Sequence, residues 1–349
     1  MSTEHKKYNE PRLKRSYSVI GHSPDIVEIR TGVWSHRSFT LTDERASGKL
    51  HSLVRGLDGS LSHRELASQV GVPRAEVEAV VDHLATLDAL EWGPDSALDA
   101  YLESVGPLRG ADAGGVAYDR VYVLGDQALV EQLAAAISEA GDVKTEVLGA
   151  RSPVVQALSR AGAETLNDGL KLAELTRQVE ELRGSVLVTV DAVVNPFRSQ
   201  LLNRVTQELG VPWLHTGVDG PFLFIGPTVV PGRSACYECF ETRVGMNIRE
   251  SASYQRYKEA LATGQVSTGE PALLSAVRTT LVGHAALEAV NLLAAGSTFS
   301  VGKVLGIYLP TMEIAWSDVL QLPGCRGCSP LAGRDDSHLY FDARTWAGE

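Results

Sequence analysis

Two short cysteine motifs constrain this chain more than any other feature. "CYEC" covers residues 236–239 and "CRGC" covers residues 325–328, and together they contain all four cysteines. Four thiols in two C-x-x-C pairs are the usual ligand set of a closed, tetrahedral zinc site. Such a site has no open position for water, so we expect structural zinc held by Cys236, Cys239, Cys325 and Cys328. Two separate redox pairs or buried free thiols are the alternatives.

Charge and hydropathy limit the partners of the chain. The formal net charge is −11, so nucleic acid is a poor partner unless a local basic patch exists. The first residues have no apolar core of signal-peptide type, and no apolar run is long enough to span a membrane. We therefore predict a cytoplasmic protein with no membrane partner. The reducing cytoplasm disfavours structural disulfides.

Residues 16–93 have the pattern of a winged helix-turn-helix domain. Ser62 and Glu65 form the expected capping box of its second helix, which ends at Gly71. Three strands and then three helices are predicted, at 17–21, 25–30, 33–41, 43–57, 62–71 and 73–92. We expect a flexible arm before this domain, at residues 1–15. The Gly- and Pro-rich residues 94–116 are predicted to form a linker.

Residues 117–349 alternate buried strands with helices, which is typical of a Rossmann-like, doubly wound α/β domain with a parallel sheet. The clearest strands are continuous apolar runs, and helical periodicity follows them. The predicted strands are 120–125, 144–149, 185–192, 211–218, 221–230 and two near 302–317. The last long helix is expected near residues 271–295.

The order of motifs in this second domain resembles the ThiF-like proteins, relatives of the ubiquitin-activating enzymes. "DAVVNPFRSQLLNR" is followed by "PGRSACYECF", "GHAALEAVNLLAAG" and "LPGCRGC". The resemblance implies a fold that adenylates a C-terminal carboxylate with ATP and carries a Cys₄ zinc site. An N-terminal winged helix narrows the resemblance to proteins of ribosomal-peptide (RiPP) pathways, where it implies binding of the leader of a precursor peptide.

Two branches share that architecture. In one, the ThiF-like domain is an active adenylating enzyme, as in microcin-type maturation. In the other, found in azole-forming and thiopeptide pathways, it delivers the peptide to a separate ATP-dependent cyclodehydratase of the YcaO type. The resemblance also implies that the chain can pair as a homodimer.

The phosphate loop favours the second branch. A dinucleotide fingerprint that starts at Gly125 needs glycines at 127 and 130, where this chain has Gln127 and Val130. The missing glycines normally allow backbone to approach phosphate and the helix to pack on the strand. Asp126 adds a negative charge at the start of a helix, where it repels an anion.

A second departure lies near residue 195. Asn195 and Arg198 match the family pattern, but Val194 stands where the resemblance implies an acid that holds magnesium on ATP, and valine cannot bind a cation. Asp191 is either ribose-binding or a polar strand end. We therefore expect a relic nucleotide site at Gly125, Asp191, Asn195 and Arg198, without bound ATP.

A winged helix can bind either DNA or peptide. The third helix carries five acidic residues, Glu76, Glu78, Asp82, Asp88 and Glu91, which argues against a DNA-binding regulator. The alternative is an extended peptide that pairs with strand 33–41 and rests on the third helix. We expect this groove to involve Trp34, Arg37, Phe39, Val80, His83, Leu84 and Leu87. Phe39, Val80, Leu84 and Leu87 are also consistent with ordinary core packing.

We therefore predict a non-catalytic protein that binds a precursor's leader and presents it to a YcaO-type cyclodehydratase, which forms azoline heterocycles. The main alternative is an enzyme that adenylates a peptide carboxylate.

Overall fold

The computed structural model describes residues 10–34, 38–91, 97–105, 118–139, 143–267 and 272–329. The chain divides into two compact units, Met1–Ser104 and Val105–Glu349, and each is described by itself. The division falls inside the predicted linker. Helix α4 (Ala97–Ser104) lies within the residues predicted to form a linker.

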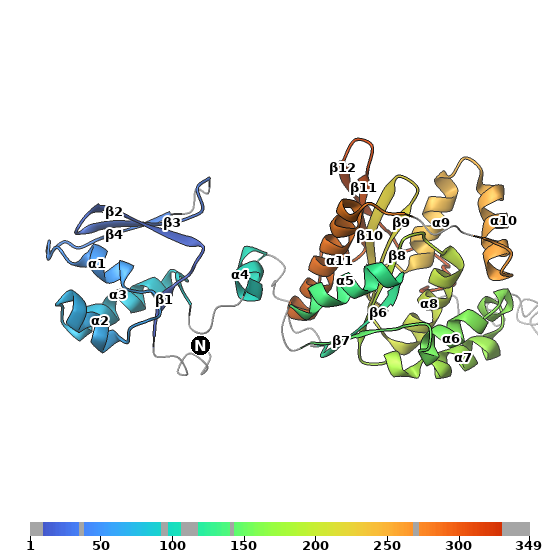
Figure 1. The fold of residues 1–349 in the computed structure, drawn as a ribbon, viewed down its shortest axis with the longest axis horizontal. Helices are drawn as coiled ribbons and strands as arrows, with labels where there is room; N and C mark the ends of the chain where they lie inside the picture. Colours follow the sequence, from blue (N-terminus) through green and yellow to red (C-terminus); the bar gives the residue numbers. More distant parts are fainter. Residues whose placement is uncertain are drawn as a thin grey trace, which may run out of the picture. The chain divides into compact units, whose positions relative to one another are not determined.

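The first unit contains the predicted three strands and three helices. Strands β2 (Tyr17–Ser23), β3 (Ile26–Thr31) and β4 (Ser38–Thr42) form an antiparallel sheet in the order β2-β3-β4. Helices α1 (Leu50–Arg55), α2 (His63–Val70) and α3 (Arg74–Thr86) lie against this sheet (Figure 1). Inward residues of β3 and β4 share one apolar core with all three helices, as the alternation of buried strand positions requires.

Local chemistry sets the ends of these helices. The capping box of Ser62 and Glu65 is present, and Gly71 ends α2 in a left-handed conformation, which confirms both predictions. Helix α1 begins later than predicted because the Asp43 carboxylate accepts the N–H groups of Arg45 and Ser47, which holds a turn there. Helix α3 ends six residues early because Asp88 takes a positive φ of 53°.

A short strand lies near the start of the described residues. Strand β1 (Arg12–Leu13) pairs antiparallel with β5 (Leu90–Glu91), and the Leu13 N–H also donates to the carbonyl of Leu57. The expectation of a flexible arm through residue 15 is therefore wrong for Arg12–Leu13. The signal was too short to see in the sequence, because each strand has only two residues.

The second unit is built on a seven-stranded sheet in the order β12-β11-β10-β9-β8-β6-β7 (Figure 1). Its strands are β6 (Arg120–Gly125), β7 (Lys144–Val147), β8 (Val186–Asp191), β9 (Trp213–Asp219), β10 (Phe222–Val229), β11 (Lys303–Tyr308) and β12 (Glu313–Asp318). Strands β7, β6, β8 and β9 are parallel, whereas β9 to β12 are antiparallel. The prediction of a parallel sheet thus holds for four strands only, because two residues alone join β9 to β10 and so short a turn forces antiparallel pairing.

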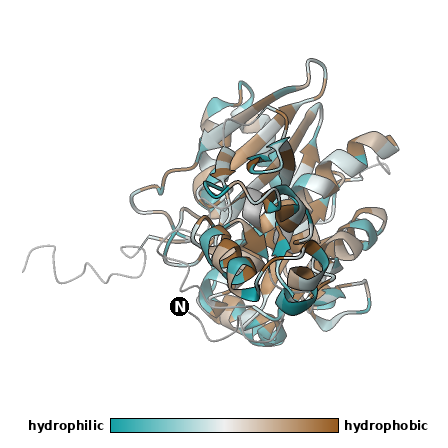
Figure 2. Ribbon diagram, turned by 90° about the vertical axis from the view of Figure 1, so that its left-hand side faces the viewer, coloured by the Kyte–Doolittle hydropathy of each residue, from teal (hydrophilic) through white to brown (hydrophobic). Residues whose placement is uncertain are grey.

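Helices cover both faces of this sheet. One face carries α5 (Gln127–Ser138) and α11 (Ser275–Ala295). The other carries α6 (Pro153–Arg160), α7 (Gly169–Gln178), α8 (Pro196–Leu209) and α9 (Tyr237–Asn247), with the short 3₁₀ turns Ala163–Leu166 and Glu180–Leu182 between them. Helix α10 (Ser251–Ala262) packs on α8 and α9. Figure 2 shows brown, hydrophobic stretches along the strands and mixed colours along the helices that cover them.

No helix within the described residues is both long and apolar enough to cross a membrane.

Gly125 is a strict requirement of the fold. Its φ is +151°, and a Cβ at this position would lie 1.8 Å from the Val190 carbonyl oxygen. We expect Gly125→Ala to destabilise the second unit by more than about 2 kcal/mol. Gly149→Ala is the matched control, because a Cβ added there would meet nothing within 4 Å and the φ of Gly149 is not positive. Thermal unfolding of both variants tests this, and equal melting temperatures would contradict it.

Candidate functional site

The four cysteines converge in the second unit. Cys236 and Cys239 lie at the start of α9, and Cys325 and Cys328 come from the segment after β12. All four sulfurs lie within 4.8 Å of one another, with Sγ–Sγ separations of 3.6 Å for Cys236–Cys325 and 3.5 Å for Cys239–Cys328. The prediction that the two motifs meet is confirmed, and the cluster could hold a metal ion.

The donor set fits zinc. A tetrahedron with metal–sulfur bonds of about 2.3 Å has sulfurs roughly 3.8 Å apart, close to the observed separations. The hydrogen bonds that the Cys236 thiol donates to the neighbouring cysteine sulfurs raise its pKa, so a cation is needed to hold this residue as a thiolate. The Leu322 N–H donates to the sulfur of Cys239, at 3.3 Å, and the Gln321 side chain donates to that of Cys328, at 3.4 Å. Such donors stabilise charged thiolates around a metal.

An arginine from α8 joins the two cysteine motifs. The Arg204 guanidinium makes a two-pronged ion pair with Glu238, one contact measuring 3.1 Å, and also donates to the carbonyl of Arg326. Next to it, the Asn203 side chain accepts the Tyr237 N–H at 2.9 Å and so caps α9. Sequence reasoning missed Arg204, because only the fold brings it to both motifs.

The predicted phosphate loop carries a carboxylate. Asp126 precedes α5, and its side chain accepts the N–H of Ala192 at the end of β8. The side-chain amide of Gln127 donates a 2.8 Å hydrogen bond to the Glu131 carboxylate on the same helix. The fold requires a glycine at residue 125, because the Val190 backbone leaves no space for a side chain there. This requirement does not depend on any ligand. The start of α5 therefore presents negative charge where a phosphate-binding loop presents free N–H groups.

The remaining residues of the predicted relic site pair with each other. Asp191 is buried, and its carboxylate binds the Arg198 guanidinium. Burial raises the pKa of Asp191, and Arg198 opposes that shift. Asn195 caps α8 by accepting the Arg198 N–H at 3.0 Å. These contacts give Asp191, Asn195 and Arg198 structural roles, and they leave the buried Nε of Arg198 without a partner among the described residues.

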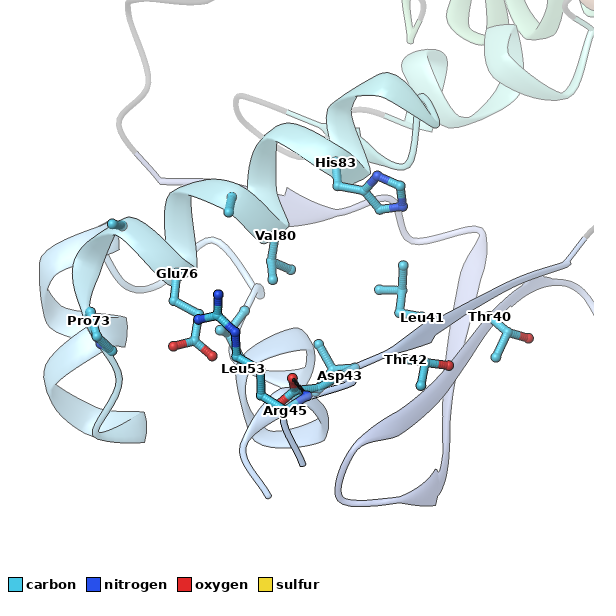
Figure 3. Close-up of a pocket in the computed structure, with 13 residues that line it drawn as sticks. Thr40, Leu41, Thr42, Asp43, Arg45, Leu53, Pro73, Glu76, Val80 and His83 are labelled. Atoms are coloured by element: carbon cyan, nitrogen blue, oxygen red, sulfur yellow. Dashed lines mark hydrogen bonds between the residues drawn. The ribbon is translucent and has the colours of Figure 1, made fainter. Parts of the chain in front are cut away.

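A groove of about 590 Å³ lies in the first unit between β4 and α3. Figure 3 shows Val80 and His83 of α3 facing Leu41 and Thr42 of β4 across it. One end carries the charged Arg45, Asp43 and Glu76, and the floor includes Leu53. Ala75 and Ala79 of α3 also line the groove, so small side chains form much of its helical wall.

Beside the groove, β4 has a free edge within the described residues, because its one partner strand there is β3. The Asp43 N–H donates to the Asp25 carbonyl, and antiparallel pairs alternate between bonded and non-bonded positions. The backbone groups of Ser38, Thr40 and Thr42 therefore point to the open edge. An extended peptide could pair with them and place side chains in the groove.

The predicted peptide-binding residues are distributed differently from expectation. Val80 and His83 line the groove. Phe39 and Leu87 are partly buried against the core, and Leu84 is fully buried in it. Trp34 is 97% exposed and lies in a bend, because β4 starts at Ser38 and not at residue 33. Arg37 lies outside the described residues. Sequence reasoning missed Ala75 and Ala79, whose spacing of four on an exposed helix face was the available signal.

Two solved structures of heterocyclases share this fold. A heterocyclase in complex with substrate and cofactor aligns with a TM-score of 0.64 and 17% identity over 91% of this chain and 39% of its own. The structure of the heterocyclase TruD aligns with a TM-score of 0.62 and 20% identity over 92% and 43%. This chain therefore spans about two fifths of the length of either structure. At these identities the likeness shows the fold alone.

A crystal structure of E. coli MccB aligns with a TM-score of 0.47 and 14% identity over 91% of this chain and 96% of its own, too weak a likeness to carry an argument. No family model matches the sequence, and no curated protein matches it.

Removing the metal will lower the thermal stability of the second unit. We expect about one zinc per chain in purified protein, measured by mass spectrometry, and little in Cys325→Ser. Because the metal joins two distant segments, the variant and the chelated protein will melt about 5 °C or more below the metal-bound protein. Adding zinc back to the chelated protein serves as the control. Metal-free protein with an unchanged melting temperature would refute the site.

Removing Arg198 leaves the Asp191 carboxylate buried without its cation. We expect Arg198→Met to lose about 3–5 kcal/mol of unfolding free energy at neutral pH. The raised pKa of Asp191 means that the folded variant holds a proton that the unfolded chain releases. Stability should therefore rise as the pH falls from about 7.5 to about 5.

Urea unfolding at both pH values measures the effect. In the double variant Asp191→Asn, Arg198→Met, most of the loss and its dependence on pH should disappear. A single variant with the same stability at both pH values would contradict the pairing.

Proposed function

We propose that this protein binds the leader segment of a ribosomally made precursor peptide and presents it to a separate ATP-dependent cyclodehydratase of the YcaO type. The first unit serves as a winged-helix recognition domain. The partner forms azoline rings at Cys, Ser or Thr, and the chain itself does not adenylate. The observation that carries the proposal is the groove beside the free edge of β4.

The chemistry of the groove suits an extended peptide. Backbone pairing with β4 supplies affinity for any sequence, and the apolar surfaces of Leu41, Leu53 and Val80 supply preference for particular side chains. His83 and Arg45 offer contacts for acidic side chains of the leader, while Glu76 and Asp43 disfavour some registers. The mixture gives specificity by both attraction and repulsion.

The same surface is unsuited to DNA. Helix α3 carries Glu76, Glu78 and Asp82, and Arg74 is engaged by Glu78 at 2.7 Å. A helix that reads a DNA groove needs net positive charge to offset the phosphates. Peptide binding is therefore favoured over a role as a DNA-binding regulator.

The second unit supports a role without adenylation. Asp126 places a carboxylate at the start of α5, and Arg198 is occupied by Asp191. A triphosphate would meet repulsion at the first and find no free cation at the second. Val194 offers no oxygen for magnesium. We infer that this unit is a scaffold that carries structural zinc and docks the partner enzyme.

The likeness in fold to the two heterocyclase structures supports the pathway. More than half of each of those chains lies outside the aligned part. We propose that the corresponding chemistry is supplied here by the partner cyclodehydratase, and that the chain can pair as a homodimer.

Filling the groove will weaken peptide binding. We expect Ala79→Glu to reduce affinity for a fluorescent leader peptide at least tenfold, because it puts bulk and charge in the groove. Ala85→Glu is the matched control, since Ala85 is exposed on the same helix but does not line the groove. Fluorescence anisotropy with and without ATP measures both, and affinity should not depend on ATP. Equal affinities of the two variants would refute the groove.

The same preparation tests adenylation directly. ATP–pyrophosphate exchange by the protein with a precursor peptide would overturn the non-catalytic assignment and revive the adenylating enzyme.

A further inference from the structure

Strand β12 lies at one edge of the sheet of the second unit and is uncovered. Its one partner strand among the described residues is β11 (Figure 1). All six residues of Glu313–Asp318 are exposed, because helix α11 packs mainly over β8, β9 and β10. Proteins usually protect such an edge with lysine, proline or a bulge. This strand contains neither residue, and its pairing with β11 has no shift of register.

The large side chains of β12 point to one face of the sheet. Ile314 and Trp316 lie opposite Ile307 and Leu305, which are buried in the core shared with α5 and α11. Directly opposite residues of two strands point to the same face. Ile314 and Trp316 therefore extend this apolar face beyond the helices, where they are 56% and 47% exposed. An exposed apolar surface along an unprotected edge indicates an interaction site.

The same two residues present backbone groups to the open edge. The Val319 N–H donates to the Gly302 carbonyl at 2.8 Å, and bonded positions alternate along an antiparallel pair. The odd-numbered residues of β12 therefore bond to β11. The N–H and carbonyl groups of Ile314, Trp316 and Asp318 point outward, so another strand can pair with them.

A second copy of β12 fits this edge in a register centred on Ala315. In an antiparallel pair about a two-fold axis, the outward-bonding residues of the two copies must oppose each other. With Ala315 on the axis, Ile314 of one copy lies opposite Trp316 of the other, and each such pair exchanges both N–H···O bonds. Glu313 then lies opposite Ser317, so no carboxylate within the paired strands opposes another. The small side chain of Ala315 suits the close approach at the axis.

The neighbouring registers are poorer. With Trp316 on the axis, the Asp318 carboxylate of one copy would lie opposite Ile314 of the other. With Ile314 on the axis, the pairing would run into Met312, which lies outside the strand and has a positive φ of 54°. The sequence of β12 is therefore complementary to itself in one arrangement.

We propose that two copies of this chain pair through β12, antiparallel and with Ala315 at the two-fold axis, so that their sheets join edge to edge. Ile314 and Trp316 of both copies then form one apolar cluster on the α11 face. The inference gives a surface to the homodimer of the proposed function and rests on that part of it alone. It does not depend on leader binding or on the partner enzyme.

A cysteine at the axis tests the register. Unbonded antiparallel pairs hold their Cα atoms about 4.5 Å apart, which is within the range of a disulfide. We expect Ala315→Cys to form a cross-linked dimer under mild oxidation, measured on a non-reducing gel. Ser317→Cys is the matched control on the same face of the strand, because its two copies lie roughly 14 Å apart in this register.

Two further samples complete the test. A mixture of Ser317→Cys with Glu313→Cys should restore the cross-link, because these positions oppose each other. The unaltered protein, oxidised in parallel, shows any cross-link made by its own four cysteines. No cross-link from Ala315→Cys, or an equal one from Ser317→Cys alone, would overturn the register.

A charge on the open edge tests the surface without a new cysteine. We expect Trp316→Lys to weaken self-association about tenfold or more in analytical ultracentrifugation, because it removes an aromatic anchor and protects the edge. Leu170→Lys is the matched control, since Leu170 is an exposed leucine on α7. Melting temperatures confirm that both variants fold. A chain that stays monomeric at every concentration, or a dimer that Trp316→Lys leaves unchanged, would refute the surface.

Leader-peptide anisotropy separates this inference from the rest of the proposed function. A monomeric Trp316→Lys protein that still binds the leader supports the β12 surface. Unaltered protein that forms the Ala315→Cys type of dimer but binds no leader would contradict leader binding and leave the surface in place.

Discussion

The meeting of four thiols is the constraint on which the second unit most depends. It joins the start of α9 to a segment that follows the last strand, and Arg204 strengthens the junction by binding Glu238 and the Arg326 carbonyl together. Helix α9 in turn carries Tyr237 and Phe240, which line a small aromatic pocket of the second unit together with Phe224 and Tyr254. The position of that pocket wall is therefore set by the cysteine cluster, because the same turn of helix contributes to both.

The second unit has the strand, turn and helix that the sequence predicted for a nucleotide-binding fold, and its polar side chains there contact other protein groups. The strand, turn and helix around Gly125 remain because backbone contact with Val190 demands a glycine there. Asp126 engages Ala192, and Arg198 engages Asp191, but the buried Nε of Arg198 has no partner among the described residues. The polar groups of this region therefore pair mainly with the protein itself, and one buried donor is left over.

The sequence predicted best those features that depend on residues close together in the chain. The pairing of the four cysteines, the capping box at Ser62 and the order of strands and helices all follow from short motifs or periodicity. The antiparallel half of the sheet was not predicted, because buried strands look alike in either direction. Strand β1 was missed because two residues carry no periodicity. The groove was located only in part: helical spacing identified Val80 and Leu84 as apolar, but the pattern could not tell that Leu84 enters the core while Ala79 faces the opening.

The free edge of β4 has a consequence for the behaviour of the protein in concentrated solution. An open strand edge is a template for pairing with other chains and so a hazard for aggregation. This edge is only five residues long, and the residues whose backbone faces outward are Ser38, Thr40 and Thr42, all exposed and polar. Such a strand offers few hydrogen bonds and little apolar area to another copy of itself. The edge of β4 therefore favours pairing between copies of this chain less than a longer and more apolar strand would.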